Sequence, residues 1–456
     1  MSGLRRLGPV AAMVLVAGNM IGSGIYMLPA TLGTIGSVSL IAWGLASLGA
    51  LLVALVFSFL AQIRPEADGV VAYAAEGLHP AAGHVSWFAY WLNCWVGTEA
   101  VAVAATGYLA YFFPVLKAPG VSTFATLGII WTLTLINLIG PRVMARYGAA
   151  TLILGLAPIA LATIAGALAF NPEIFAASWN VSGKPDSVVI TASVAPIFWA
   201  FLGLESAVVA AAVIDNPKKN LPIATVGGVL LAAVIYMAAS AAIMGLAPAS
   251  VMAASTAPFA DAIHEFAGPV AASLVAFCAL AKASGTVGGW VLVTAETSRS
   301  GTAAGYLPKM ASEVNPDRKP TRDILVAAGL MSAATIASAS PTLGAEFTML
   351  INVAVILSMI LYLLCAAALL RLSGEIEGPR RYAAIAAAVL GGGFCAWVIV
   401  TSEPRPAHAH PGDRRRQPGA LGRRPLHVQA QARLTPGHAF AGPGQGPSSR
   451  KMGETR

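Results

Sequence analysis

Long blocks of hydrophobic residues, separated by short polar segments, fill the chain as far as residue 401. Each block is close to the roughly 20 residues that an α-helix needs to cross the hydrocarbon core of a bilayer. The pattern therefore predicts an all-α, polytopic membrane protein. Eleven spans are expected, at residues 8–29, 38–62, 86–113, 121–139, 149–170, 188–213, 222–246, 269–298, 323–339, 345–371 and 381–401.

The composition agrees with this class. Hydrophobic residues make up 57% of the chain and charged residues 11%, whereas a soluble domain carries about 25% charged residues. The first block is long, contains polar residues and leads directly into a second block, which favours a membrane span over a cleavable signal peptide. The four cysteines all fall in apolar blocks at no metal-ligand spacing, so we expect small buried side chains and neither a metal nor a cofactor.

The positive charges alternate between the loops. If the N-terminus lies inside, the inner loops hold fifteen of the 18 Lys and Arg residues before residue 402, the outer loops hold Lys117 and Lys184, and Lys282 lies within a span. This positive-inside bias predicts a cytoplasmic N-terminus in a bacterial inner membrane. The formal net charge of +8 therefore does not indicate nucleic-acid binding.

Two spans carry interruptions marked by glycine. The first span contains Gly22, Ser23 and Gly24, and the sixth contains Gly203 beside Glu205. The interruptions are five spans apart, and an odd repeat length gives the second copy the opposite orientation, as in the inverted repeats of many secondary transporters. We therefore predict an inverted five-helix repeat with discontinuous first and sixth helices, its copies at about 8–170 and 188–371, followed by an extra span at 381–401.

A broken helix exposes unpaired backbone N–H groups where its second half begins. In a membrane such groups are tolerated where they line a cavity, and there they form an anion site suited to a carboxylate. The alternative for residues 22–24 is close helix–helix packing through small residues. The matching interruption in the sixth span favours the binding interpretation.

Three ionisable residues, Glu99, Glu205 and Lys282, lie near the middle of spans, where charge is costly and usually functional. Because burial disfavours a charged carboxylate, Glu205 is a candidate proton carrier, or else a structural carboxylate bonded to its neighbours. Lys282 is either a proton-linked cation or a structural counter-ion. Glu99 is its candidate partner, because a buried pair costs less than either charge alone.

Two tryptophans, Trp199 and Trp290, lie well inside their spans, away from the interfacial belts where Trp usually anchors. Buried Trp most often packs, but an aromatic face also stabilises a cationic substrate in a dry cavity. No nucleophile–base set, metal cluster or phosphate loop appears in the sequence. Transport is therefore favoured over a membrane enzyme or a sensor.

Residues 402–456 differ in composition from the rest. They are rich in Pro, Gly, Arg and His and nearly free of bulky aliphatic residues, so they are predicted to be disordered. After an eleventh span this basic tail would lie on the periplasmic side, against the positive-inside pattern. We therefore expect a transmembrane domain over residues 1–401 and an aberrant C-terminus, such as a frameshifted end of a normal transporter.

Several motifs resemble those of one transporter family, over residues 18 to about 370. They are GNMIGSG at 18–24, YWL at 90–92 with CW at 94–95, GYL at 107–109 with YFFP at 111–114, WNVSG at 179–183, GLESA at 203–207, NPKKN at 216–220 and GGW at 288–290. In these motifs the chain resembles the bacterial arginine/agmatine antiporters of the amino acid–polyamine–organocation superfamily. The resemblance implies a LeuT-like fold, alternating access, and proton-linked exchange of an arginine-like amino acid for its decarboxylated amine in acid resistance.

The resemblance also implies residue roles. Trp290 would stack on the guanidinium and Trp199 would be a middle gate, while Glu205, Tyr90 and Tyr362 would form an inner gate with Glu205 responding to protons. Asn19 and the turn at residues 22–24 would hold the carboxylate and amino group of the substrate. The full set expected around the substrate is Asn19, Ile21, Gly22, Ser23, Gly24, Asn93, Cys94, Thr98, Trp199, Leu202, Trp290 and Ala354.

This chain departs from the arginine exchangers at several of these positions. Thr98 replaces an Asn, Asn93 a small Ala, and Ala354 a hydroxyl-bearing residue, while Glu99 and Lys282 replace uncharged residues. The polar groups around the substrate are therefore rearranged, which leaves open a lysine/ornithine–diamine exchanger or a proton-coupled amino acid symporter. The family has twelve spans, the last pair of which contributes to a homodimer, so dimerisation of a chain with eleven visible spans is left open.

Overall fold

A computed structural model describes residues 8–402, with the exception of residues 23, 68, 207–213, 309–311 and 313–319. Ser23 and the predicted disordered tail from residue 403 onward therefore lie outside the described residues. The described part consists of helices, turns and loops, without a β-strand. This agrees with the all-α class that the hydrophobic blocks predicted.

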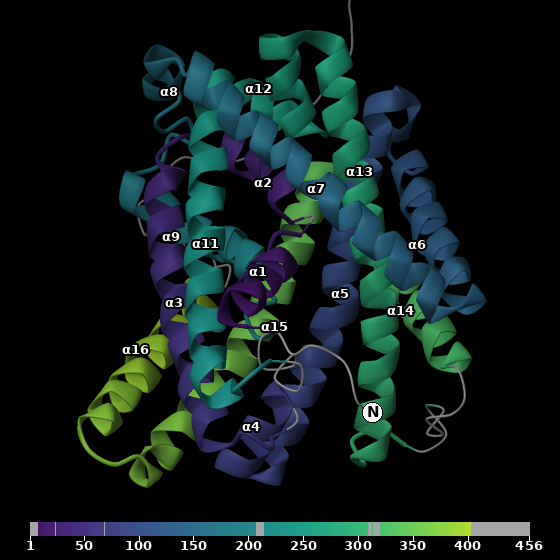
Figure 1. Ribbon diagram of the computed structural model, residues 1–456. Helices are drawn as coiled ribbons and strands as arrows, with labels where there is room; N and C mark the ends of the chain where they lie inside the picture. Colours follow the sequence, from purple (N-terminus) through teal and green to yellow (C-terminus); the bar gives the residue numbers. More distant parts are fainter. Residues whose placement is uncertain are drawn as a thin grey trace, which may run out of the picture. The chain divides into compact units, whose positions relative to one another are not determined.

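The helices follow the hydrophobic blocks of the sequence (Figure 1). Their bounds are α1 Pro9–Met20, α2 Gly24–Gly33, α3 Ser39–Ile63, α4 Val70–Gly77, α5 Pro80–Phe112, α6 Val121–Ile139, α7 Pro141–Ala169, α8 Pro172–Ala177, α9 Asp186–Phe198, α11 Pro217–Leu246, α12 Ala249–Ala254, α13 Pro258–Ala303, α14 Thr321–Ser338, α15 Leu343–Leu372 and α16 Pro379–Ser402. Short 3₁₀ turns follow α5 (η1, Pro114–Lys117), α9 (η2, Trp199–Phe201) and α15 (η5, Ser373–Glu375).

Seven helices in the described part are long and apolar enough to cross a bilayer, and the bent pair α1 and α2 makes an eighth span if counted as one. The chain is therefore a multi-pass membrane protein. α5 is long enough but carries polar residues such as Glu99 along its length, and α9 is short because its span is broken. The count of eleven spans and the inverted relation of the two repeats stay predictions.

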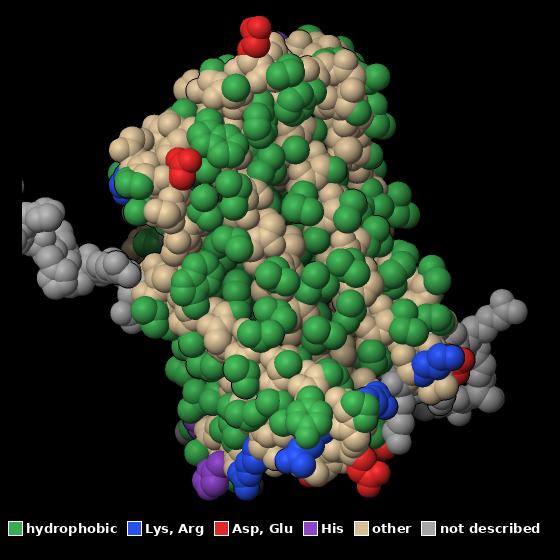
Figure 2. Space-filling model, turned by 90° about the vertical axis from the view of Figure 1, so that its left-hand side faces the viewer, with side chains coloured by type: hydrophobic (Ala, Val, Ile, Leu, Met, Phe, Trp, Pro, Cys, Tyr) green, Lys and Arg blue, Asp and Glu red, His purple; other side chains and the backbone are tan. Residues whose placement is uncertain are grey.

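The outer surface fits a lipid environment (Figure 2). Hydrophobic side chains cover the middle of the face in that view, and charged side chains gather toward its two ends. Large apolar residues such as Phe124, Ile153 and Val270 are exposed on the outside. Exposure of so much apolar surface is unfavourable in water but favourable against lipid tails.

Helical geometry ends at both of the positions marked by glycine. α1 ends at Met20, α2 begins at Gly24, and the two are bent by 49°. The second break follows η2, where residues 202–205 form a turn and Gly203 adopts φ +98°. This left-handed conformation strains any residue with a Cβ, which explains the glycine at that position.

These breaks lie among the long helices (Figure 1). α5 packs against both α13 and α15, α13 also packs against α7, and α11 packs against α1 and α3. α2 contacts α5, α9, α13 and α15. A further bend interrupts α13, where Gly268 has φ +79° and Pro269 cannot donate a backbone hydrogen bond. Residue 269 is also where the predicted hydrophobic block begins.

Candidate functional site

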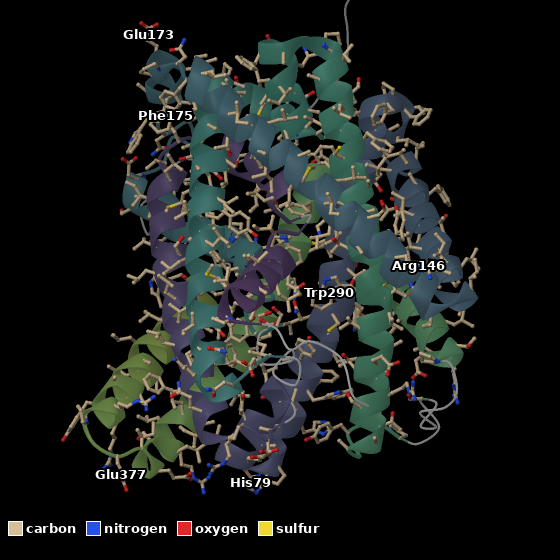
Figure 3. The ribbon with its side chains drawn as sticks, viewed as in Figure 1. His79, Arg146, Glu173, Phe175, Trp290 and Glu377 are labelled. Atoms are coloured by element: carbon tan, nitrogen blue, oxygen red, sulfur yellow. The ribbon has the colours of Figure 1, made fainter. Side chains whose placement is uncertain are left out.

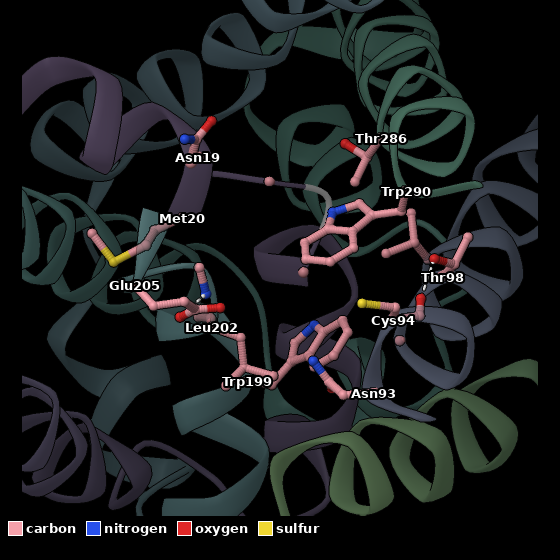
Figure 4. A pocket seen from close by; sticks show the side chains of 16 residues that line it. Asn19, Met20, Asn93, Cys94, Thr98, Trp199, Leu202, Glu205, Thr286 and Trp290 are labelled. Atoms are coloured by element: carbon pink, nitrogen blue, oxygen red, sulfur yellow. Dashed lines mark hydrogen bonds between the residues drawn. The ribbon is translucent and has the colours of Figure 1, made fainter. Parts of the chain in front are cut away.

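A cavity lies where the two broken spans meet α5 and α13 (Figure 4). The space between its walls, counted together with the part open to solvent, is about 560 Å³. In Figure 3, Trp290 of the cavity lies between the end that carries Glu173 and the end that carries His79 and Glu377. The lining residues are Asn19, Met20, Gly22, Gly24, Asn93, Cys94, Gly97, Thr98, Val101, Trp199, Ala200, Leu202, Gly203, Glu205, Thr286 and Trp290.

Backbone groups of the first break form one wall. The Ile21 N–H donates to the Ala17 carbonyl at 2.7 Å and the Gly22 N–H donates to the Met20 carbonyl at 2.6 Å, which closes the end of α1. α2 then begins at Gly24, and the first N–H groups of a helix have no partner within it. The N-terminus of α2 therefore presents partial positive charge at the cavity wall, where it suits a carboxylate.

The indole of Trp199 is wedged between α2 and α5. A Cβ added to Gly24 would lie 2.5 Å from Nε1 of Trp199, and one added to Gly97 would lie 3.2 Å from Cη2 at the other edge of the ring. A Cβ at Gly24 would overlap the ring, and one at Gly97 would press tightly against its other edge. Trp199 is 9% exposed, and its Nε1 has no hydrogen-bond partner.

The wall formed by α5 supplies polar atoms. Asn93, Cys94, Gly97, Thr98 and Val101 recur at helical spacing on one face of α5, as Figure 4 shows for the labelled members. The Thr98 hydroxyl donates to the Cys94 carbonyl at 2.5 Å, so its lone pairs remain available to accept. Asn93 Oδ1 is buried and lacks a donor. This wall can therefore accept hydrogen bonds from a ligand.

The turn of the second break holds Glu205 at the cavity. The Tyr362 hydroxyl of α15 donates to Glu205 Oε2 at 2.7 Å, and the Gly203 N–H donates to the same oxygen at 3.2 Å. Glu205 is 5% exposed and Tyr362 is 2% exposed. A carboxyl group held by a turn of one span and a hydroxyl of another links the two elements.

The structure gathers most, but not all, of the residues predicted around the substrate. Ile21 and Ala354 are buried away from the cavity wall, and Tyr90 and Tyr362 also lie outside the wall. No hydrogen bond joins Tyr90 to Glu205 among the described residues. The predicted residues that line the cavity are Asn19, Gly22, Gly24, Asn93, Cys94, Thr98, Trp199, Leu202, Glu205 and Trp290.

Sequence reasoning missed several wall residues. Gly97 and Val101 lie one turn from Asn93 and Gly97 respectively on α5, and Thr286 lies one turn before Trp290 on α13. Helical spacing from the predicted residues could have found these three. Met20 and Ala200 flank the breaks and carry no polar side chain to mark them, whereas Gly203 was predicted at the break but not as part of the cavity wall.

Glu99 and Lys282, weighed above as a candidate pair, do not meet. Glu99 of α5 accepts a hydrogen bond from Ser338 of α14 at 2.7 Å. Lys282 instead packs against Gly155 of α7, where an added Cβ would lie 2.5 Å from its Cγ. No ion pair within 4.0 Å connects Glu99 and Lys282, both of which are described. The two residues face different neighbours, which their sequence positions could not reveal.

Comparisons with known proteins identify the family of the chain. A family model for amino acid permeases matches residues 7–407. The chain is 35% identical to the cadaverine/lysine antiporter of Escherichia coli (strain K12) over 401 residues, which cover 87% of this chain and 89% of that protein.

Two further relatives carry the name putrescine transporter PotE. The protein from Escherichia coli (strain K12) is 30% identical over 381 residues, covering 84% of this chain and 87% of its own length. The protein from Haemophilus influenzae (strain Rd) is 30% identical over 378 residues, covering 83% and 87%. With a family match over nearly all of its predicted spans and relatives at 30% and 35% identity, the chain belongs to the amino acid permease family of the amino acid–polyamine–organocation superfamily.

Proposed function

We propose that this protein exchanges a cationic amino acid for its decarboxylated amine across the bacterial inner membrane, with its N-terminus in the cytoplasm. The observation that carries the proposal is the cavity at the two helix breaks, which combines the N-terminus of α2, an aromatic face and the acceptor Asn93 Oδ1, which has no donor. Lysine with cadaverine is the first pair to test, because a relative at 35% identity is named for these two compounds.

The start of α2 suits the carboxylate of the amino acid. Its unpaired N–H groups and the helix dipole stabilise a negative charge. Asn19, at the end of α1, adds a side-chain amide at the same break. An amine produced by decarboxylation lacks the carboxylate, so it would bind with fewer contacts at this end and rely on the opposite end of the cavity.

The α5 wall and Trp290 suit a primary ammonium. An ammonium group carries three hydrogen-bond donors and no acceptor, and Asn93 Oδ1 and Thr98 Oγ1 offer acceptors that no protein donor occupies. Trp290 offers the face of an indole, which stabilises a desolvated cation. Arginine presents a planar guanidinium with five donors. The counterflow experiment described below decides whether arginine is also a substrate.

Glu205 supports linkage to protons. It lies at the cavity, fully enclosed, and its hydrogen bond from Tyr362 connects the sixth span to α15. A negative charge in this place costs desolvation energy unless a cation or a proton accompanies it. Loss of a cationic substrate therefore favours proton uptake by Glu205, which gives exchange a dependence on pH.

Counterflow in proteoliposomes tests the exchange. Vesicles loaded with lysine, cadaverine, ornithine, putrescine, arginine or agmatine, or with buffer alone, are mixed with labelled lysine outside. We expect uptake only into vesicles loaded with a cationic amino acid or amine, fastest with cadaverine or lysine. Equal uptake into vesicles without internal substrate excludes strict exchange, and a preference for arginine and agmatine replaces the lysine assignment.

Proton-coupled symport is a second candidate, favoured by Lys282. This residue lies within α13 against Gly155 of α7, without an ion pair among the described residues. A membrane-embedded amine that gains and loses a proton would couple uptake to the proton gradient. Symport predicts uptake of lysine into empty vesicles. This uptake should be lost when the pH gradient is removed, and it should also be lost in the Lys282→Met variant; both results support symport over exchange.

A further inference from the structure

A second buried polar cluster lies outside the cavity, where α5, α14 and α15 meet. Glu99 of α5 and Glu346 in the first turn of α15 are 0% and 2% exposed. Ser338, the last residue of α14, lies between them. Its Oγ is 2.7 Å from Glu99 Oε1 and 3.4 Å from Glu346 Oε1. The two carboxyl groups therefore reach the same hydroxyl oxygen.

The number of hydrogens in this cluster does not match two ionised carboxylates. A serine hydroxyl carries one hydrogen and can donate it to one partner. If Ser338 donates to Glu99, the contact with Glu346 is attractive only when Glu346 itself carries a proton and donates it to Ser338. The hydroxyl can also turn, in which case the proton belongs on Glu99. Either arrangement is most favourable when the pair holds one proton.

The second oxygen of Glu99 points to the same conclusion independently. Glu99 Oε2 is buried, and no donor reaches it. An ionised carboxylate accepts at both oxygens, and leaving one of them buried and unpaired is costly. A protonated carboxyl group has a smaller demand for donors, so the unpaired oxygen fits a group that holds a proton.

Neutralisation by a basic side chain is absent from the described surroundings. No Lys, Arg or His lies within 4.0 Å of either carboxylate in the described residues. On α14 the charged residues Arg322 and Asp323 lie in the first turn, about 20 Å along the helix from Ser338. α6 contains no ionisable residue, and Lys282 of α13 faces Gly155.

The remaining contacts of the cluster are neutral. α2 contacts α15 through Thr31, whose hydroxyl lies 2.9 Å from that of Thr348. Thr335, one turn before Ser338, donates its hydroxyl to the Met331 carbonyl, and the same hydroxyl also lies within hydrogen-bond reach of Glu99. The charge on the pair is therefore set by Glu99 and Glu346 themselves, in a dry environment where two adjacent negative charges repel strongly.

We propose that Glu99 and Glu346 share one bound proton through Ser338, forming a proton site separate from the cavity. The binding step does not depend on what the protein transports, whereas its consequence for exchange rests on the proposed function. Glu99 lies on α5 beside Thr98 of the cavity wall but points to α14 and α15. Release of the proton leaves two carboxylates at the contact of α5 with α15, which weakens that contact and moves the cavity wall.

Infrared spectroscopy of the reconstituted protein tests the proton directly. The carbonyl stretch of a protonated carboxyl group is followed against pH in the Glu205→Gln background, which removes the carboxyl group of the cavity. We expect a band that persists near neutral pH and titrates in a step of its own, because the two carboxyls ionise separately. Glu99→Gln with Glu346→Gln should abolish this step, and the exposed control Glu265→Gln should leave it unchanged.

Single variants decide whether the proton is shared. In Glu346→Gln the like charge is gone, so the step that remains for Glu99 should move to lower pH. Ser338→Ala keeps both carboxyls but removes the hydroxyl, and it should move the step to higher pH. Absence of a band near neutral pH, or an unchanged step in the double variant, overturns the proposal. Loss of the band on adding sodium at constant pH and ionic strength assigns the site to a metal cation instead.

Thermal unfolding provides a measurement that does not require transport. If the folded protein holds a proton that the unfolded chain releases near neutral pH, stability falls as pH rises. Glu346→Gln should flatten this dependence relative to Glu265→Gln, and an equal slope in both contradicts the shared proton. If the infrared step appears as expected but no cationic amino acid or amine is exchanged, the proposed function is rejected and the proton site stands.

Discussion

Replacement of Gly24 by Ala tests the wedge that positions Trp199. The added Cβ would lie 2.5 Å from Nε1, 2.9 Å from Cδ1 and 3.4 Å from Cε2 of the indole. Favourable contacts between such atoms begin at about 3.5 Å, so the overlap is about 1 Å. The ring cannot move freely toward α5, because its other edge already lies against Gly97.

The magnitude follows from the cost of overpacking. Inserting a methyl group into a well-packed site costs about 1–3 kcal/mol, which corresponds to about 5- to 140-fold in an equilibrium constant. We expect the affinity for substrate in Gly24→Ala to decrease by a factor within this range, because Trp199 must shift into the cavity that it lines. The backbone N–H of residue 24 is kept, so the anion site at the start of α2 is not removed.

Gly18→Ala is the matched control. Gly18 lies in α1, and an added Cβ there meets no atom within 4 Å. Both substitutions favour helical backbone by up to about 1 kcal/mol, so their difference isolates the steric effect on Trp199. The assay is binding of labelled lysine to purified protein. Wild-type affinity in Gly24→Ala, or an equal loss in Gly18→Ala, would refute the assignment of Trp199 to the binding site.

Three further substitutions test other parts of the site and the fold. Trp290→Leu should weaken binding of a cationic substrate by about 1–2 kcal/mol beyond lost packing, while Trp290→Phe should retain part of the affinity; equal losses would exclude cation–π stacking. Glu205→Ala should flatten the pH dependence of exchange in vesicles, and an unchanged profile would place the proton-responsive group elsewhere. Glu375→Gln breaks the two exposed hydrogen bonds with Arg64, at 2.6 and 2.7 Å. It should lower the free energy of unfolding by at most about 1 kcal/mol, and this effect should decrease at high salt. A larger or salt-independent loss would show that this contact is needed to hold α3 against the end of α15.

Much of the fold followed from the sequence because membrane helices are specified locally. A bilayer demands long apolar segments with internally paired backbone, so each hydrophobic block predicted the position of a helix. Glycine marked both interruptions: Gly203 adopts a left-handed backbone that strains other residues, and Gly24 leaves space for the Trp199 ring. Asn93, Cys94 and Thr98 were predicted at the cavity through the family resemblance, and their helical spacing agrees with a common face.

The partner of each buried side chain was decided only by the tertiary structure. Lys282 was a candidate partner of Glu99, but Glu99 meets Ser338 and, through that hydroxyl, Glu346, which are 239 and 247 positions away in the sequence. Trp199 depends on two glycines from different helices. In a membrane, lipid-facing and helix-facing positions are both apolar, so hydropathy fixes where helices are but not how each is rotated against its neighbours. That rotation brings Glu99 to Ser338, and side-chain packing in three dimensions alone determines it.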